Sequence, residues 1–184
     1  MMKHFFAISL TALLFSCGPA VKPEAELVTD FKHKKEVFDF DFNSNKIDKI
    51  KSQGDSIVIV ADQIIEAYPE AKDMPEVLYG VAEVYEKMEN FNKSIEFYSK
   101  FVEKYPKHEK AAYALYISGY QYELLKNVEK AIEVLQNVRK NYPESDYADL
   151  AKNKIIDLRN NQAQEKEMEQ AKHLYDSLEA TINK

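Results

Sequence analysis

The chain has 184 residues, of which 45% are hydrophobic and 30% charged, with four glycines and six prolines. This composition is typical of one globular, helix-rich domain. The formal net charge of −6 argues against nucleic acid and anionic lipid surfaces as partners, because an acidic surface repels phosphate groups.

The first residues predict a secretory signal. Lys3 and His4 precede an apolar run from Phe5 to Phe15. As a helix this run would span only about 16 Å at roughly 1.5 Å per residue, too short for a hydrocarbon core of about 30 Å. We therefore expect residues 1–16 to be a cleaved signal peptide and not a transmembrane anchor.

Leu14-Phe15-Ser16-Cys17, at the end of the run, resembles the lipobox of bacterial lipoproteins. The resemblance implies that cleavage occurs before Cys17 and that this cysteine is lipidated. Several acyl chains would hold the protein firmly on a membrane, because a single chain binds only marginally. The alternative is a plain secretory peptide that leaves Cys17, the only cysteine, as a free thiol.

Residues 17–43 are predicted to hold the lipidated cysteine and a tether. We assign the tether to residues 18–30, which contain Pro19 and Pro23. Residues 31–42 contain too many aromatic side chains for a solvated linker. We expect part of this stretch to dock on the first repeat, with an edge strand as the alternative. The aromatic residues concerned are Phe31, Phe38, Phe40 and Phe42.

The dipeptide Tyr-Pro occurs at Tyr68-Pro69, Tyr105-Pro106 and Tyr142-Pro143, at a constant interval of 37 residues. Such a period is typical of helical repeats, which stack because one unit cannot bury its own apolar face. We predict a solenoid over residues 44–159.

The first repeat has the weakest helical pattern. A short helix around Ile47 and Ile50 should end at Gly54, and a second helix should be capped by Asp55 and end at Tyr68. The later repeats each show two apolar periodic segments separated by an asparagine, which indicates two antiparallel helices per repeat.

These repeats resemble the tetratricopeptide repeat (TPR), in which small residues lie where the paired helices approach and a proline ends the unit. The resemblance implies an all-α solenoid of helical hairpins, with about three repeats, a capping helix and a C-terminal amphipathic helix. Leu78 and Leu115 stand where the pattern has tryptophan. The matching residues are Ala82, Gly119, Tyr85, Tyr122, Ser94, Ala131, Tyr98, Leu135, Pro69, Pro106 and Pro143.

Over residues 55–159, the long repeats with Tyr-Pro endings are similar to those of BamD-like envelope lipoproteins and periplasmic TolA-binding proteins. The resemblance implies a non-catalytic protein-binding scaffold, anchored by lipid to the bacterial outer membrane and facing the periplasm, that serves outer-membrane assembly or maintenance. A second interpretation is an adaptor of a Tol-like cell-wall or division complex. A third is a glycan-binding surface lipoprotein, although the chain lacks tryptophan, the best sugar-stacking side chain.

The C-terminal part is predicted to contain a closing helix through Ala151 and Leu158, followed by a charged helix over residues 160–184. In this charged helix, apolar residues recur at steps of three and four, as in a coiled-coil seam. We expect an amphipathic helix that is exposed or packed back on the solenoid, and self-association or partner binding through 162–182 is the alternative. The apolar positions are Met168, Ala171, Tyr175, Leu178 and Ile182.

In a stacked solenoid, the first helix of each repeat would line the concave face, where its side chains outside the core could contact a partner. Tyrosines beside glutamates suit an extended, basic peptide segment of an envelope protein, because tyrosine offers a large, rigid contact area. The alternative is that these tyrosines pack between helices. The predicted binding residues are Tyr79, Glu83, Glu86, Tyr113, Tyr116, Tyr120 and Glu123.

The sequence offers little support for catalysis. His4, His33, His108 and His173 are isolated, and the glycines are too scattered for a phosphate-binding loop. The carboxylates are mixed with lysines, as expected for a solvated face. We predict that the protein is not an enzyme and has no cofactor and no metal.

Overall fold

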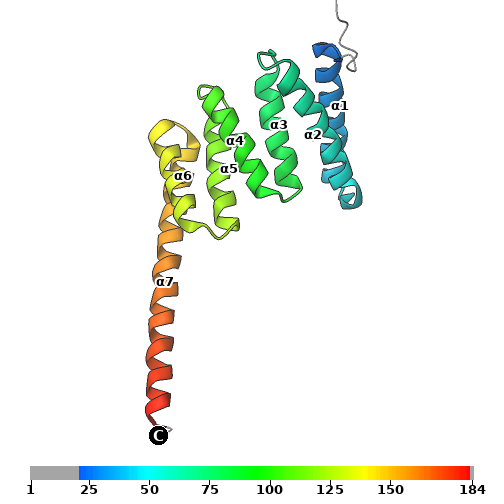
Figure 1. Ribbon diagram of the computed structural model, residues 1–184. Helices are drawn as coiled ribbons and strands as arrows, with labels where there is room; N and C mark the ends of the chain where they lie inside the picture. Colours follow the sequence, from blue (N-terminus) through cyan, green and yellow to red (C-terminus); the bar gives the residue numbers. More distant parts are fainter. Residues whose placement is uncertain (1–20, 183–184) are drawn as a thin grey trace, which may run out of the picture.

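The computed structural model describes residues 21–182 of the chain. Consecutive helices form the antiparallel pairs α1/α2, α3/α4 and α5/α6, and α7 stacks on α6 (Figure 1), so the predicted all-α solenoid is confirmed. A single turn of 3-10 helix (Ile47–Lys49) precedes α2. The helices are α1 (Glu24–Asn43), α2 (Ile50–Ala67), α3 (Met74–Lys87), α4 (Phe91–Lys104), α5 (Ala111–Leu124), α6 (Val128–Asn141) and α7 (Asp146–Ile182).

The Tyr-Pro pairs end the second helix of each pair. Helices α2, α4 and α6 stop immediately before Tyr68, Tyr105 and Tyr142, and each of these tyrosines donates its backbone N–H to the carbonyl four residues earlier. The following proline has no N–H to continue the helix. The side chains of Asn90 and Asn127 cap the starts of α4 and α6. The repeat boundaries are thus set by local backbone chemistry.

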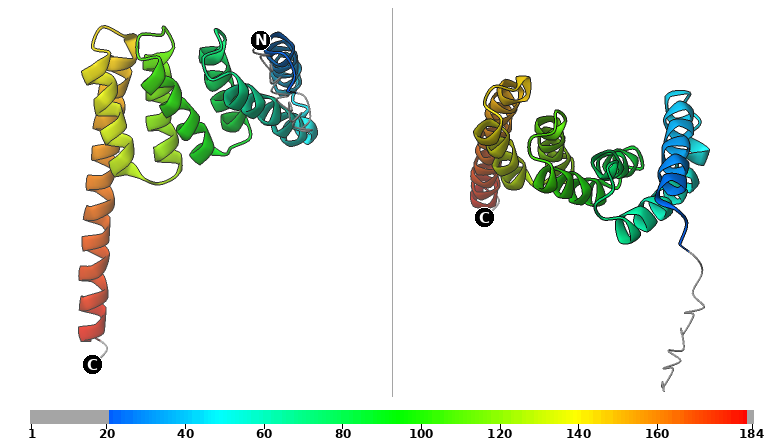
Figure 2. Two further views of the ribbon diagram at one scale, coloured as in Figure 1. Left: turned by 45° about the horizontal axis from the view of Figure 1, so that its top comes forward. Right: turned by 90° about the horizontal axis from the view of Figure 1, so that it is seen from above.

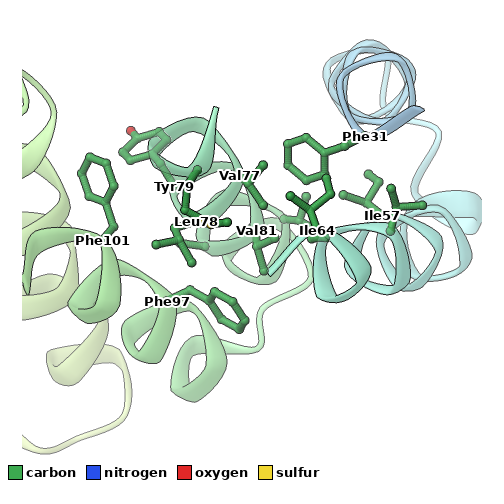
Figure 3. Close-up of a cluster of buried hydrophobic side chains, with 14 of the residues drawn as sticks. Phe31, Ile57, Ile64, Val77, Leu78, Tyr79, Val81, Phe97 and Phe101 are labelled. Atoms are coloured by element: carbon green, nitrogen blue, oxygen red, sulfur yellow. The ribbon is translucent and has the colours of Figure 1, made fainter. Parts of the chain in front are cut away.

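The TPR-like positions form the contacts between paired helices. A Cβ atom on Gly119 of α5 would lie 2.8 Å from the side chain of Leu135 on α6, so any larger residue would require Leu135 to shift. Ala82 and Tyr98 occupy the corresponding places in α3 and α4 and are fully buried. The cluster that contains Ala82 and Tyr98 continues across α1 and α2, where Phe31 lies over Ile64 and Val77 (Figure 3).

Residues 24–43 form helix α1, so the predicted tether is wrong from residue 24 onward and the edge-strand alternative is wrong too. The expected docking of the aromatic stretch is confirmed, because Phe31 and Phe38 are buried in the core. Pro23 precedes the first turn, and Leu27, Phe31 and Phe38 are buried against the following helices. These residues recur at steps of four and seven, which places them on one helical face. Phe40 lies on the opposite side and is 64% exposed, which hides the helical period in the sequence.

Helix α2 runs through Gly54 without a break, and Asp55 lies in its interior, so both boundary predictions for the first repeat were wrong. The cost of glycine inside a helix is only about 1 kcal/mol relative to alanine. Packing of the buried residues Ile50, Ile57 and Ile64 outweighs that cost. The first helical pair is therefore α1/α2.

Helix α7 crosses the predicted boundary at residue 159 as one continuous element. Its first part caps the solenoid with the buried residues Ala151, Ile155 and Leu158. Ile156 stands where α3 has Ala82 and α5 has Gly119, and it is half exposed because no further helix packs there.

The second part of α7 extends beyond the solenoid (Figure 1). Between residues 159 and 179 all side chains are exposed except that of Gln162, which is partly buried. Packing back on the solenoid is therefore wrong for this segment, which leaves exposure to solvent or contact with another molecule. None of the helices in the described range has both the length and the apolar character needed to cross a membrane.

Candidate functional site

The row of helices is curved, and helices α1 and α3 lie on its inner side (Figure 2, right). A hollow of about 460 Å³ opens there between α1, α3 and the loop before α5. Its lining is aromatic at the base and charged at the rim. The lining residues are Phe31, Lys32, Lys35, Glu36, Asp39, Pro75, Glu76, Tyr79, Gly80, Glu83, His108, Glu109 and Lys110.

A second hollow adjoins the first and shares Glu83 with it. It extends between the C-terminal ends of α1 and α3 toward α5. We call the two together the inner groove, and Tyr79, Glu83, Glu86 and Tyr113 among the predicted binding residues line it. The lining residues of the second hollow are Phe42, Glu83, Glu86, Lys87, Glu89, Phe91 and Tyr113.

Ion pairs among four charged side chains connect α1 and α3 along the wall of the groove. Lys35 lies 2.7 Å from Asp39 and 3.0 Å from Glu83, and Lys87 lies 2.7 Å from Asp39. Burial raises the pKa of Asp39, but the hydrogen bonds from Lys35 and Lys87 outweigh it, so the net pKa is lowered. Glu83 is thus already paired within the protein, and these ion pairs hold the wall of the groove in place.

Glu86 has a different environment. Its carboxylate accepts a hydrogen bond from the Tyr98 hydroxyl at 2.8 Å, and no ion pair to it is found within residues 21–182. Burial is the main cause that raises the pKa of Glu86 above its ordinary value. The groove therefore holds a partly desolvated carboxylate that a cationic group of a ligand could neutralise.

We expect Glu86→Gln to raise the free energy of unfolding near neutral pH, with a gain that shrinks on acidification. Because the folded-state pKa of Glu86 is raised, the folded chain binds this proton more readily than the unfolded chain. Lowering the pH through the folded-state pKa therefore stabilises the wild type relative to the glutamine variant. Urea unfolding of both chains from roughly pH 7 to about pH 4 checks this. A difference that widens toward acid would contradict it.

Tyr79 is mostly a core residue. It is only 7% exposed, and its ring packs edge-on against Tyr98 with ring centroids 5.5 Å apart. It packs in the same way against Phe101, at 5.4 Å (Figure 3). Lys110 lies over the ring at 4.4 Å, and burial raises the pKa of the hydroxyl. Packing between helices thus describes most of the Tyr79 side chain, and only part of it borders the groove.

The remaining predicted residues of α5 lie toward α7. Tyr116 packs on Tyr147 with ring centroids 5.7 Å apart, whereas Lys154 lies over Tyr120 and forms an ion pair with Glu123 at 2.6 Å. Tyr113 also contacts Tyr147, at 5.3 Å, from the edge of the inner groove. The seven predicted residues therefore divide between the groove and the contact with α7.

The wall contributed by α1 was missed because residues 24–43 were not recognised as a helix. A detectable signal was present, since Phe31, Lys35 and Asp39 recur at steps of four, as residues on one helical face do. No cluster of His, Cys, Asp or Glu within the described part of the chain could hold a metal ion.

The comparison with curated proteins finds no match. Residues 59–181 match the sequence model of the YfiO family, whose description is outer membrane lipoprotein. The match covers about two thirds of the chain, from within α2 to the last turn of α7, and includes α3 and α5 of the groove but neither α1 nor Cys17. The chain belongs to the YfiO family of outer membrane lipoproteins.

Proposed function

We propose that this protein is a non-catalytic scaffold that faces the periplasm and holds an extended, basic segment of an envelope protein in its inner groove. Its role would lie in the assembly or maintenance of the outer membrane, and lipid on Cys17 would anchor it. Membership of the outer membrane lipoprotein family supports the location and the scaffold role. The shape and charge of the groove support the chemistry of the partner.

The observation that carries the proposal is the environment of Glu86. Its carboxylate is partly buried in a groove with the aromatic side chains of Phe42, Phe91 and Tyr113. A carboxylate withdrawn from water without a cation costs free energy, which an incoming lysine or arginine would recover. The aromatic rings would contact the aliphatic part of that side chain or hold its charge over a ring face.

The position of α1 defines how far the groove can lie from the membrane. Cys17 precedes the first residue of α1, Glu24, by seven residues. At about 3.6 Å per residue, this segment spans at most about 25 Å. A lipid on Cys17 would therefore keep the start of α1 close to the membrane surface, where a segment of a membrane protein could reach the groove.

We expect Glu86→Gln to reduce capture of the partner from crosslinked envelopes by about tenfold or more, because the ligand's cation loses its charged counterpart. Glutamine keeps the size of the side chain and an acceptor for Tyr98. The matched control is Glu66→Gln, on an exposed position of the outer helix α2, which should leave capture unchanged.

Identification of the captured proteins tests the biological role. The proposal predicts components of a membrane-protein assembly machine. Recovery of cell-wall enzymes would favour the adaptor interpretation, and recovery of neither would contradict both. Equal capture by the wild type and Glu86→Gln would contradict the groove as the binding site.

A further inference from the structure

The C-terminal segment of α7 forms a helix that no part of the solenoid supports. The last described hydrogen bond from this helix to the solenoid joins Gln162 to Glu129 at 2.9 Å. No ion pair among the described residues involves a position after Lys154. The segment continues the packed part of α7, so its helix needs no separate nucleation, but its exposed side chains gain no stability from packing on the solenoid.

The exposed apolar side chains of this segment lie on one side. Met168, Tyr175 and Leu178 are 67%, 67% and 54% exposed. Ala171 belongs to the same stripe and follows the buried Ala151 by twenty residues, which at about 100° per residue places it about 200° around the helix. The apolar stripe therefore faces away from the solenoid. A partner could bind the stripe while the first part of α7 stays packed on the solenoid.

We propose that this stripe is a docking surface for a second copy of the chain and that residues 164–182 form a parallel two-stranded coiled coil. Met168 and Tyr175 take the a positions of the heptad, and Ala171 and Leu178 the d positions. Each helix is already formed as a continuation of α7, so association does not bear the cost of helix nucleation. The seam is short, and its register depends on the flanking charges.

The flanking charges select the parallel orientation. In a parallel pair, Glu167 at position g lies beside Lys172 at position e of the second copy, and symmetry makes this contact twice. An antiparallel pair with the same apolar residues facing each other would place Lys172 beside Lys172 and Glu165 beside Glu179. Attraction in one arrangement and repulsion in the other favour a parallel dimer.

Thiol crosslinking of the full chain in its envelope tests the arrangement. Ala171→Cys should form a disulfide-linked dimer, because equivalent d positions face each other in a parallel pair. The control is His173→Cys, which is also exposed but lies on the far side of the helix, and should give no more crosslinked dimer than the wild type. Crosslinking of Ala171→Cys to a different protein, or no crosslink above background, would overturn the proposal.

Two further variants distinguish a specific parallel pairing of the helices from nonspecific association. Glu167→Lys should weaken dimerisation about tenfold, and adding Lys172→Glu in the same chain should restore it. Failure of the double variant to recover would overturn the parallel register. Disulfides that form only in mixtures of Ala171→Cys with Tyr175→Cys would show an antiparallel pair and would also overturn it. Circular dichroism of each variant verifies that the helix remains formed.

Discussion

Phe38→Ala should lower the free energy of unfolding by about 3–5 kcal/mol, the usual cost of removing a buried phenylalanine side chain. Phe38 is fully buried in α1 and packs in the core shared with α2 and α3. The loss would be a large fraction of a total stability that is typically about 5–15 kcal/mol. Urea unfolding followed by circular dichroism measures it, with the slope of the transition as a check on cooperativity.

The matched control is Phe40→Ala, two residues away in the same helix. Phe40 is 64% exposed, so its removal should change the free energy of unfolding by no more than about 0.5 kcal/mol. The contrast between the two variants tests whether α1 is part of the solenoid. If both variants were equally harmless, α1 would not be part of the folded solenoid.

Cys17→Ser should abolish attachment of lipid to the protein. Each methylene that an acyl chain inserts into the bilayer contributes about 0.8 kcal/mol, so several chains on one cysteine supply nearly all of the membrane affinity. Growth with labelled fatty acid should therefore label the wild type and leave Cys17→Ser unlabelled. The family assignment supports this expectation, although the matched residues begin well after Cys17.

A second variant distinguishes lipidation directed by the lipobox from acylation of any accessible thiol. Ser52 is exposed on α2, and Ser52→Cys in the Cys17→Ser background moves the only thiol to the folded domain. This chain should take no label. Label on the relocated cysteine, or equal label on wild type and Cys17→Ser, would contradict lipidation at Cys17.

The sequence was sufficient for the solenoid wherever helix ends depend on local chemistry. Each Tyr-Pro pair ends a helix through its own backbone, and Asn90 and Asn127 cap the next one through their side chains. Gly119 could be assigned to a close helix contact because its place in the repeat requires a small residue. These features need no knowledge of distant contacts.

Helix α1 depended on tertiary packing, which the sequence pattern obscured. Phe38 and Phe40 are equally apolar in the sequence, yet one is buried and the other exposed. The candidate site divides in the same way. The positions of Glu83 and Glu86 followed from the helical period of α3. In contrast, Lys154 reaches Tyr120 and Glu123 only because α7 packs against α5.

The central claim is that the inner groove holds a segment of a partner. Site-specific photocrosslinking from α1 tests this claim most directly. Phe42 lines the groove, whereas Phe40 in the same helix does not. A photoreactive phenylalanine analogue at position 42 should crosslink in intact envelopes to a lysine- or arginine-containing segment of one protein, and the same analogue at position 40 should not. Adducts from position 40 that equal those from position 42, or no adduct from position 42, would contradict it.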